Sequence, residues 1–267
     1  MLLHKPRLKS KPGGFTMVEL VIVIVLMSLV SLAGVEVIRQ SSESYLKMSN
    51  RQGLGSAARL AVERLSREFR SALPGSVRTS GDCIEFLPIE VAGTYVTAPF
   101  ESAGTSMTVV RVSADLAAEL GRVAIYSVGD NVFDLDAGIL SPEASIGASD
   151  AGNISTVSWT GSHLFEFESP TSRFYMVSDP VSYCVDGDNL FRYSNYGVVD
   201  PQPLLDDLPT ALPDRALLVN QVSSTGTPFR VMDPGLSRNA IVMIVLSLST
   251  DGEFLQITQE AQLRNVP

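Results

Sequence analysis

The residues best placed to take part in chemistry lie near the amino end, in the sequence GGFTMVE at residues 13–19. Glu19 is the single ionisable side chain in an otherwise apolar run of 21 residues, Phe15 to Val35. A carboxylate in hydrocarbon costs about 2.5–3.5 kcal/mol on insertion scales unless it is protonated or paired. Because no Lys, Arg or His lies within a helical turn of Glu19, its partner is expected on another chain or at a newly cut amino terminus.

A glycine pair, Gly13 and Gly14, precedes the apolar run, whereas a secretory signal has its cleavage site after a shorter apolar core. A cut after Gly14 removes a basic leader and leaves a new amino group at Phe15. If two such helices pack side by side, displaced by about one turn, this amine meets Glu19 of the neighbour. The alternative is a Glu19 near the membrane surface that reaches toward water or stays protonated.

The apolar run is long enough to cross a membrane, since its helix would span about 31 Å. Four basic residues precede it, so the positive-inside rule keeps the leader cytoplasmic and the rest outside: Lys5, Arg7, Lys9 and Lys11. The whole chain has a net charge of −9, so removing the +4 of the leader leaves −13 on the remainder. This acidic body repels phosphate backbones, and no nucleic acid partner is predicted.

The sequence GFTMVEL at residues 14–20 resembles the class III signal of type IV pilins and of type II secretion pseudopilins. In that family a prepilin peptidase cuts after the glycine, the new terminal Phe is N-methylated, and the glutamate guides docking into a growing filament. The resemblance implies processing at Gly14 and Phe15 and an assembly role for Glu19. It also implies three partners: other pilin or pseudopilin subunits, the prepilin peptidase and an inner-membrane assembly platform.

The chain is expected to divide into a cleaved leader (1–14), a transmembrane assembly helix (15–36), its amphipathic continuation (37–75) and a periplasmic β-rich domain (76–267). Apolar residues at helical spacing support the continuation: Leu54, Ala58, Ala61, Leu65, Phe69 and Ala72. Pro74 and Gly75 are expected to end it. The sequence GLGSAA at 53–58 imitates a dinucleotide-binding loop but falls inside this helix, where its glycines make a soft spot.

Beyond residue 80 the period changes to two, which predicts antiparallel strands at Cys83–Pro88, Met107–Val112, Leu164–Glu168 and Phe174–Val177. Hairpins are predicted over 181–197 and 240–263, with AIVMIVLSL as a buried central strand. Segments 129–162 and 198–215 are rich in Gly, Ser, Asp and Pro and are predicted to be surface loops. The fold class is therefore α+β, a pilin-like fold in which a long N-terminal helix packs on a C-terminal antiparallel sheet.

The chain contains two cysteines, Cys83 and Cys184, and neither has the spacing of a zinc site. In an exported body they are expected to form a disulfide. The alternative is two buried free thiols.

Elsewhere the sequence offers little chemistry: it has no nucleophile elbow, HExxH or P-loop, and no catalytic residue, metal ligand or cofactor is predicted. His163 is expected to pack or to lie on the surface rather than to act as a base. Asp130, Asp134 and Asp136 alternate in a way that suits calcium, but turn solvation is the expected role because the EF-hand spacing is absent.

Several short segments of the sequence also resemble the MshO-type minor pilins of the mannose-sensitive haemagglutinin pilus. They are ARLAVERLSREFRSALPGSVR, CIEFLPI, VSYCV, LFRYSNYG and the final RNVP. The J-type minor pseudopilin of type II secretion has a similar build and stays open. Two functions of another class also stay open: a membrane-anchored periplasmic enzyme and an adhesin whose loops hold a receptor.

Overall fold

The computed structural model describes residues 13–110, 120–127, 132–148, 153–223, 226–232 and 240–263. The chain forms two compact units, Met1–Asn50 and Arg51–Pro267. A single helix, α1 (Met17–Arg70), contributes to both units.

The first unit is built on the amino-terminal part of α1. Its apolar stretch is long and apolar enough to cross a membrane by length and composition. Every residue from 13 to 49 is exposed, including the apolar ones. The first ion pairs after the apolar run join Arg39 to Glu36 and Glu43, each at 2.8 Å. This charge cluster marks the point where the helix becomes suited to water.

In the second unit, α1 has the amphipathic face that the sequence predicts. Its buried residues recur at spacings of three and four: Leu54, Ala58, Ala61, Val62, Leu65, Ser66 and Phe69. The glycines at 53 and 55 lie inside an uninterrupted helix, so no nucleotide-binding loop forms there. The helix ends at Arg70, a few residues before the predicted stop, and Gly75 adopts a positive φ of 79° in the turn that follows.

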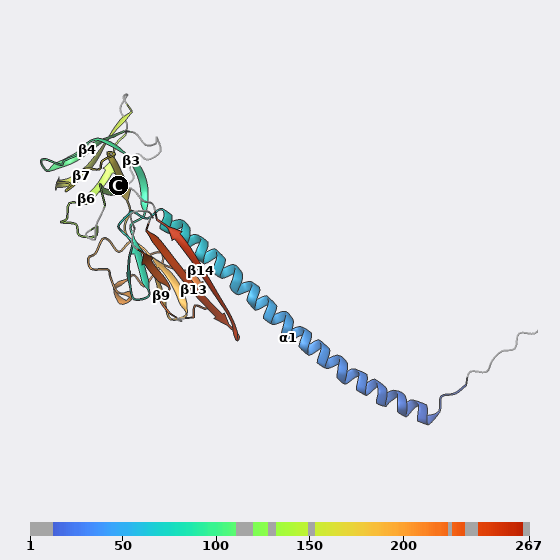
Figure 1. Cartoon of the computed structure of the whole chain (residues 1–267). Helices are drawn as coiled ribbons and strands as arrows, with labels where there is room; N and C mark the ends of the chain where they lie inside the picture. The colour runs from blue at the N-terminus through green and yellow to red at the C-terminus, as the bar shows by residue number, and fades with distance from the viewer. Residues whose placement is uncertain are drawn as a thin grey trace, which may run out of the picture. The chain divides into compact units, whose positions relative to one another are not determined.

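Two antiparallel sheets pack around this part of α1 (Figure 1). The first has the order β1 (Arg78–Ser80), β2 (Cys83–Phe86), β9 (Val181–Asp186), β10 (Asn189–Tyr193) and β11 (Arg215–Asn220). The second has the order β12 (Phe229–Met232), β13 (Ile241–Thr250) and β14 (Glu253–Gln262). Arg51 on α1 forms an ion pair with Glu253 at the start of β14.

The core between α1 and the two sheets is centred on Phe69, which has no exposed surface. Its ring makes edge-to-face contacts with Phe86, Tyr183 and Phe229, with centroid distances of 5.4, 6.2 and 6.3 Å. Because these three rings come from both sheets, one helical side chain joins the helix to each of them.

A closed antiparallel barrel is inserted between β2 and β9, and Figure 1 shows several of its strands gathered together. Its strand order is β3 (Ile89–Thr97), β4 (Gly104–Val110), β7 (Ile154–His163), β6 (Leu140–Ile146), β5 (Leu120–Ala124) and β8 (Arg173–Val177). The barrel has a hydrophobic core of its own, which includes Met107, Val157, Trp159 and Phe174. A second buried cluster joins the barrel to the rest of the unit, because Ala124, Leu140 and Val177 pack with Leu73 and Leu87.

The α+β fold class is confirmed, as are both hairpins and the central place of the AIVMIVLSL strand. The loop predicted over 129–162 is wrong, because β6 and most of β7 lie within it. In β7, buried Val157 and Trp159 alternate with exposed Thr156, Ser158 and Thr160, and that alternation outweighs the loop-like composition. Segment 198–215 holds a short 3-10 helix, η2 (Leu205–Asp207), and reaches the first residue of β11.

The strand predicted at Leu164–Glu168 is also wrong. Phe165 is buried in the barrel core, but its backbone N–H bonds the carbonyl of Pro99, and that of Glu166 bonds Gly138. The alternation in this segment therefore reflects one anchoring ring rather than a strand.

The predicted disulfide is present: Cys83 on β2 is bonded to Cys184 on β9, and the two residues are directly opposite in the ladder. The bond joins positions 101 residues apart and encloses the whole barrel. It locks the two strands between which the barrel is inserted.

Replacing both cysteines by serine is expected to lower the free energy of unfolding by about 4–5 kcal/mol, because the disulfide reduces the conformational entropy of the unfolded chain, and a long loop makes this reduction large. Denaturant unfolding with and without reductant measures the difference. The double variant is the control, since reductant should not affect it further. A midpoint of the unmodified chain that stays unchanged on reduction would contradict the role given to the bond.

Candidate processing and assembly site

The start of α1 brings the predicted site residues together in one short stretch. Residues 13–16 are exposed and precede the helix, and nothing lies within 4 Å of an added Cβ at Gly13 or Gly14. Phe15 is 78% exposed. The peptide bond between Gly14 and Phe15 thus lies in an open, non-helical segment that a protease can reach.

Thr16 caps the helix. Its Oγ1 accepts the backbone N–H of Glu19 at 3.3 Å, and its carbonyl accepts the N–H of Leu20 at 3.2 Å. A Thr cap with Glu at the third helical position has the spacing of a capping box. Of the two hydrogen bonds of that motif, the structure shows the one from the Glu19 backbone N–H to the Thr16 hydroxyl. Glu19 also lies in the first turn, where the helix dipole favours a negative charge. Among the described residues its carboxylate has no ion-pair partner.

Comparison with known families gives one match: residues 9–35 correspond to the prokaryotic N-terminal methylation motif. The chain carries a prepilin-type signal. The matched range contains the Gly14–Phe15 bond, Glu19 and the apolar run, and it supports a type IV pilin-like protein that is anchored by a single membrane helix. It also favours a structural subunit over an enzyme. Comparisons with curated proteins and with solved structures found no match.

The predicted aspartate cluster is only partly visible, because Asp130 lies outside the described residues. Asp134 Oδ1 accepts the backbone N–H of Asp136 at 2.9 Å, which is the turn role expected for it. Within the described ranges, no group of three His, Cys, Asp or Glu side chains is placed to hold a metal ion.

His163 ends β7 and packs on two aromatic rings, with its centroid 4.5 Å from that of Phe165 and 6.1 Å from that of Trp159. Burial lowers the pKa of its imidazole, so the ring is neutral near pH 7. These contacts agree with the packing role predicted for it.

A buried charged network that the sequence did not indicate lies beside the disulfide. Glu85 on β2 has no exposed surface. It accepts hydrogen bonds from Arg78 Nε at 2.5 Å and from the Tyr196 hydroxyl at 2.9 Å. Arg78 also reaches Asp200 at 2.9 Å, and its guanidinium lies 3.5 Å from the ring centroid of Phe133. The one available signal was a glutamate inside the apolar strand CIEF, and its partners are distant in sequence.

The network is structural rather than catalytic, because its carboxylate is enclosed on every side. Burial raises the pKa of Glu85, and the bonds from Arg78 and Tyr196 only partly offset this. Burial likewise raises the pKa of the Tyr196 phenol, which therefore remains a donor. The arrangement ties β1 and β2 to the segments that carry Tyr196 and Asp200.

The raised pKa predicts a pH dependence of stability. Between the ordinary value of 4.5 and the raised folded value, the folded chain holds more of the Glu85 proton than the unfolded chain does. The contribution of this group to the free energy of unfolding is therefore complete below pH 4.5 and falls as pH rises through the folded pKa.

Unfolding curves measured from acid to neutral pH are expected to show this fall in the unmodified chain and not in Glu85→Gln. Glu63→Gln, on the exposed face of α1, is the matched control and should keep the pH dependence of the unmodified chain. If the Glu85→Gln curve runs parallel to that of the unmodified chain, the pKa assignment is incorrect.

Proposed function

We propose that the chain is a minor pilin or pseudopilin subunit that a prepilin peptidase processes and that assembles into a filament through α1. The observation that carries this proposal is the methylation motif at residues 9–35, which runs directly into a helix whose apolar part holds one charge, Glu19. The basic leader favours an inner-membrane helix with the second unit in the periplasm. The Cys83–Cys184 disulfide agrees with that oxidising compartment.

Processing cuts the Gly14–Phe15 bond and exposes an amine at Phe15, which is then methylated. Thr16 becomes the second residue of the mature chain, so the bond from Glu19 N–H to Thr16 Oγ1 survives the cut. The mature helix therefore keeps its cap, and Glu19 stays close to the new terminus.

Assembly replaces lipid contacts with contacts between helices. The apolar side chains from Phe15 to Val35 are exposed along the helix, as a segment that packs first in lipid and then among like helices requires. In the dry bundle the carboxylate of Glu19 pairs with the Phe15 amine of a neighbouring subunit, which removes the cost of burying either charge alone.

The finer assignment is an MshO-type minor pilin that primes or caps a pilus like the mannose-sensitive haemagglutinin pilus. This assignment is supported by the short sequence segments in α1, β2, β9 and β10 that resemble MshO-type minor pilins. The inserted barrel gives the subunit a bulk that suits low abundance in a filament. The J-type minor pseudopilin is the alternative, since it would use the same helix.

The processing step is tested by mass spectrometry of the native protein from its own host. The mature chain is expected to begin at Phe15 with one methyl group on its amine. Gly14→Arg should block the cut by placing a bulky charge at the bond, while Gly13→Ala serves as the milder neighbouring control. Native protein that begins at Met1 would overturn the proposal.

The pairing role of Glu19 is tested by the amount of subunit in sheared filaments. Glu19→Ala is expected to leave processing largely intact and to reduce incorporation several-fold, because the neighbour's buried amine loses its counter-charge. Ser28→Ala is the matched control, since Ser28 is a polar residue of the same helix whose hydroxyl donates to the Ile24 carbonyl at 2.7 Å. Full incorporation of Glu19→Ala would refute the pairing.

A further inference from the structure

The second half of α1 has an outward face, on the opposite side from the residues that pack on the two sheets. The residues of this face are all exposed and recur at spacings of three and four, so they form one stripe along the helix: Ser56, Leu60, Glu63, Arg67 and Arg70. Arg59 is also exposed and borders the stripe, because it follows Ser56 by three residues and precedes Glu63 by four. These six residues form the outer face of α1.

Three charges on the outer face lack partners, although the helix places opposite charges within reach. Arg59, Glu63 and Arg67 follow one another at intervals of four residues, which is the spacing of ion pairs along a helix. Directly beside them, Arg64 and Glu68 do form such a pair at 3.1 Å. Within the described ranges, Arg59, Glu63 and Arg67 make no ion pair and no side-chain hydrogen bond. Their charges are therefore open to groups from outside the chain.

The outer face also carries an apolar side chain that can pack. Leu60 is 70% exposed, and in the fully described stretch from Arg51 to Arg70 it is the one large apolar side chain that is exposed. Four residues earlier, Ser56 is small, and its hydroxyl already donates to the Gly53 carbonyl at 2.9 Å. A leucine one turn from a small, satisfied side chain suits the close approach of a second helix.

The order of the charges fits a second helix of the same sequence at one displacement. When two parallel copies of α1 are displaced by one turn, about 6 Å, each residue lies level with the residue four positions away in the other copy. Arg59 is then level with Glu63 of the second copy, and Glu63 is level with Arg67 of the second copy. Without displacement, Arg59 is level with Arg59, and after two turns it is level with Arg67. Both of these arrangements oppose like charges, so complementarity selects the displacement of one turn.

We propose that the outer face of α1 binds the outer face of a second copy, parallel and displaced by one turn, through the pairs Arg59–Glu63 and Glu63–Arg67. This inference rests on the proposed function, in which the same displacement brings the amine of Phe15 to Glu19 of a neighbour. Because α1 is one uninterrupted helix, a single displacement can satisfy both sets of charges. The two copies contribute different residues to the contact, so each retains a free set of charges for a third copy, as a filament requires.

Cysteine cross-linking measures the displacement. Gln52 is exposed, and it lies level with Ser56 of a copy that is displaced by one turn. The full chain is expressed in its own host as a mixture of Gln52→Cys and Ser56→Cys copies with different tags, and the cells are then oxidised. Cys83 and Cys184 are bonded to each other, so only the introduced thiols are available. We expect the mixture to give several-fold more dimer than Ser56→Cys alone, which reports helices without displacement.

A reversed variant tests the charges separately from the helix. Arg59→Glu, Glu63→Arg and Arg67→Glu together keep opposite charges at intervals of four, so the helix itself retains its favourable spacing. Reversed copies that carry the two cysteines should cross-link with one another as well as unmodified copies do. Reversed copies with Gln52→Cys should cross-link several-fold less with unmodified copies that carry Ser56→Cys, because like charges are then level. Arg230→Glu, at an exposed arginine of β12, changes the net charge equally and should cross-link normally with the unmodified copies.

The proposal is overturned if the mixture forms no dimer, if Ser56→Cys alone gives the most dimer, or if reversed and unmodified copies cross-link normally. It is also overturned if the reversed copies fail to cross-link with one another. Mass spectrometry of the same cells separates this inference from the proposed function. A chain that begins at Phe15 and enters sheared filaments without a cross-link overturns the contact between outer faces alone, whereas a chain that begins at Met1 overturns both.

Discussion

The second unit depends on four residue pairs between β2 and β9, from Cys83–Cys184 to Phe86–Val181. Because side chains alternate across a strand, the two faces of this ladder have different tasks. Ile84, Phe86 and Tyr183 enter the core beneath α1. The opposite face holds the disulfide and the buried carboxylate of Glu85. A one-residue slip would exchange the two faces, and the covalent bond between the strands forbids it.

This constraint also explains why a charged network can remain buried next to a hydrophobic core. Arg78 and Tyr196 approach Glu85 from different parts of the chain, and the bonds hold only while the ladder is in register. Removing one partner would leave a charge without compensation in a closed site. The bonds of the network thus depend on the register of the ladder, whereas the core around Phe69 buries apolar side chains from α1 and from both sheets.

The sequence was sufficient for the features that depend on local pattern. The apolar run and the spacing of Leu54, Ala58 and Leu65 predict α1, and turn residues between alternating strands predict both hairpins. The disulfide was predicted because the part of the chain beyond the membrane is expected in an oxidising compartment. The barrel did not follow, because its closure pairs β3 with β8, which are far apart in the chain. Its strands β6 and β7 also have the composition of loops.

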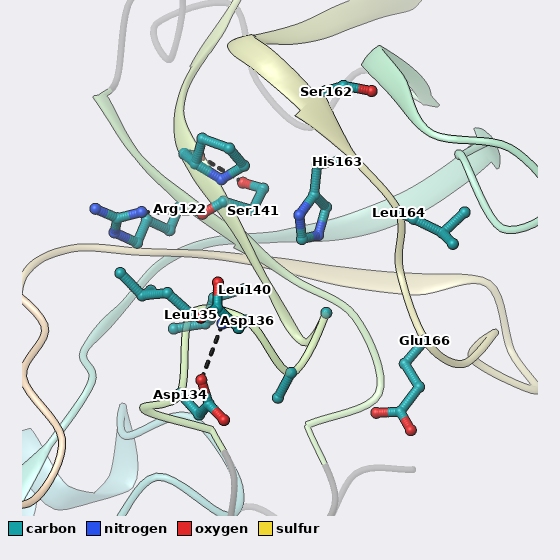
Figure 2. A pocket seen from close by; sticks show the side chains of 13 residues that line it. Arg122, Asp134, Leu135, Asp136, Leu140, Ser141, Ser162, His163, Leu164 and Glu166 are labelled. Atoms are coloured by element: carbon teal, nitrogen blue, oxygen red, sulfur yellow. Dashed lines mark hydrogen bonds between the residues drawn. The ribbon is translucent and has the colours of Figure 1, made fainter.

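The candidate sites also differ in whether their residues are close together in the sequence. Gly14, Phe15 and Glu19 lie in one continuous stretch, so their relation was readable from spacing. A pocket on the barrel takes Arg122, Asp136 and Glu166 of its lining from three separate segments (Figure 2), and a close backbone approach at Gly138 brings two of these segments together. No local pattern encodes such an approach, although a glycine at a position with positive φ is consistent with it.

The barrel leaves the sheet after Phe86 and returns at Val181, and these two residues are neighbours in the ladder. An insertion whose ends already touch does not force its two flanking strands apart. The pairing of β2 with β9 thus serves at once as part of the sheet beneath α1 and as the base from which the barrel projects.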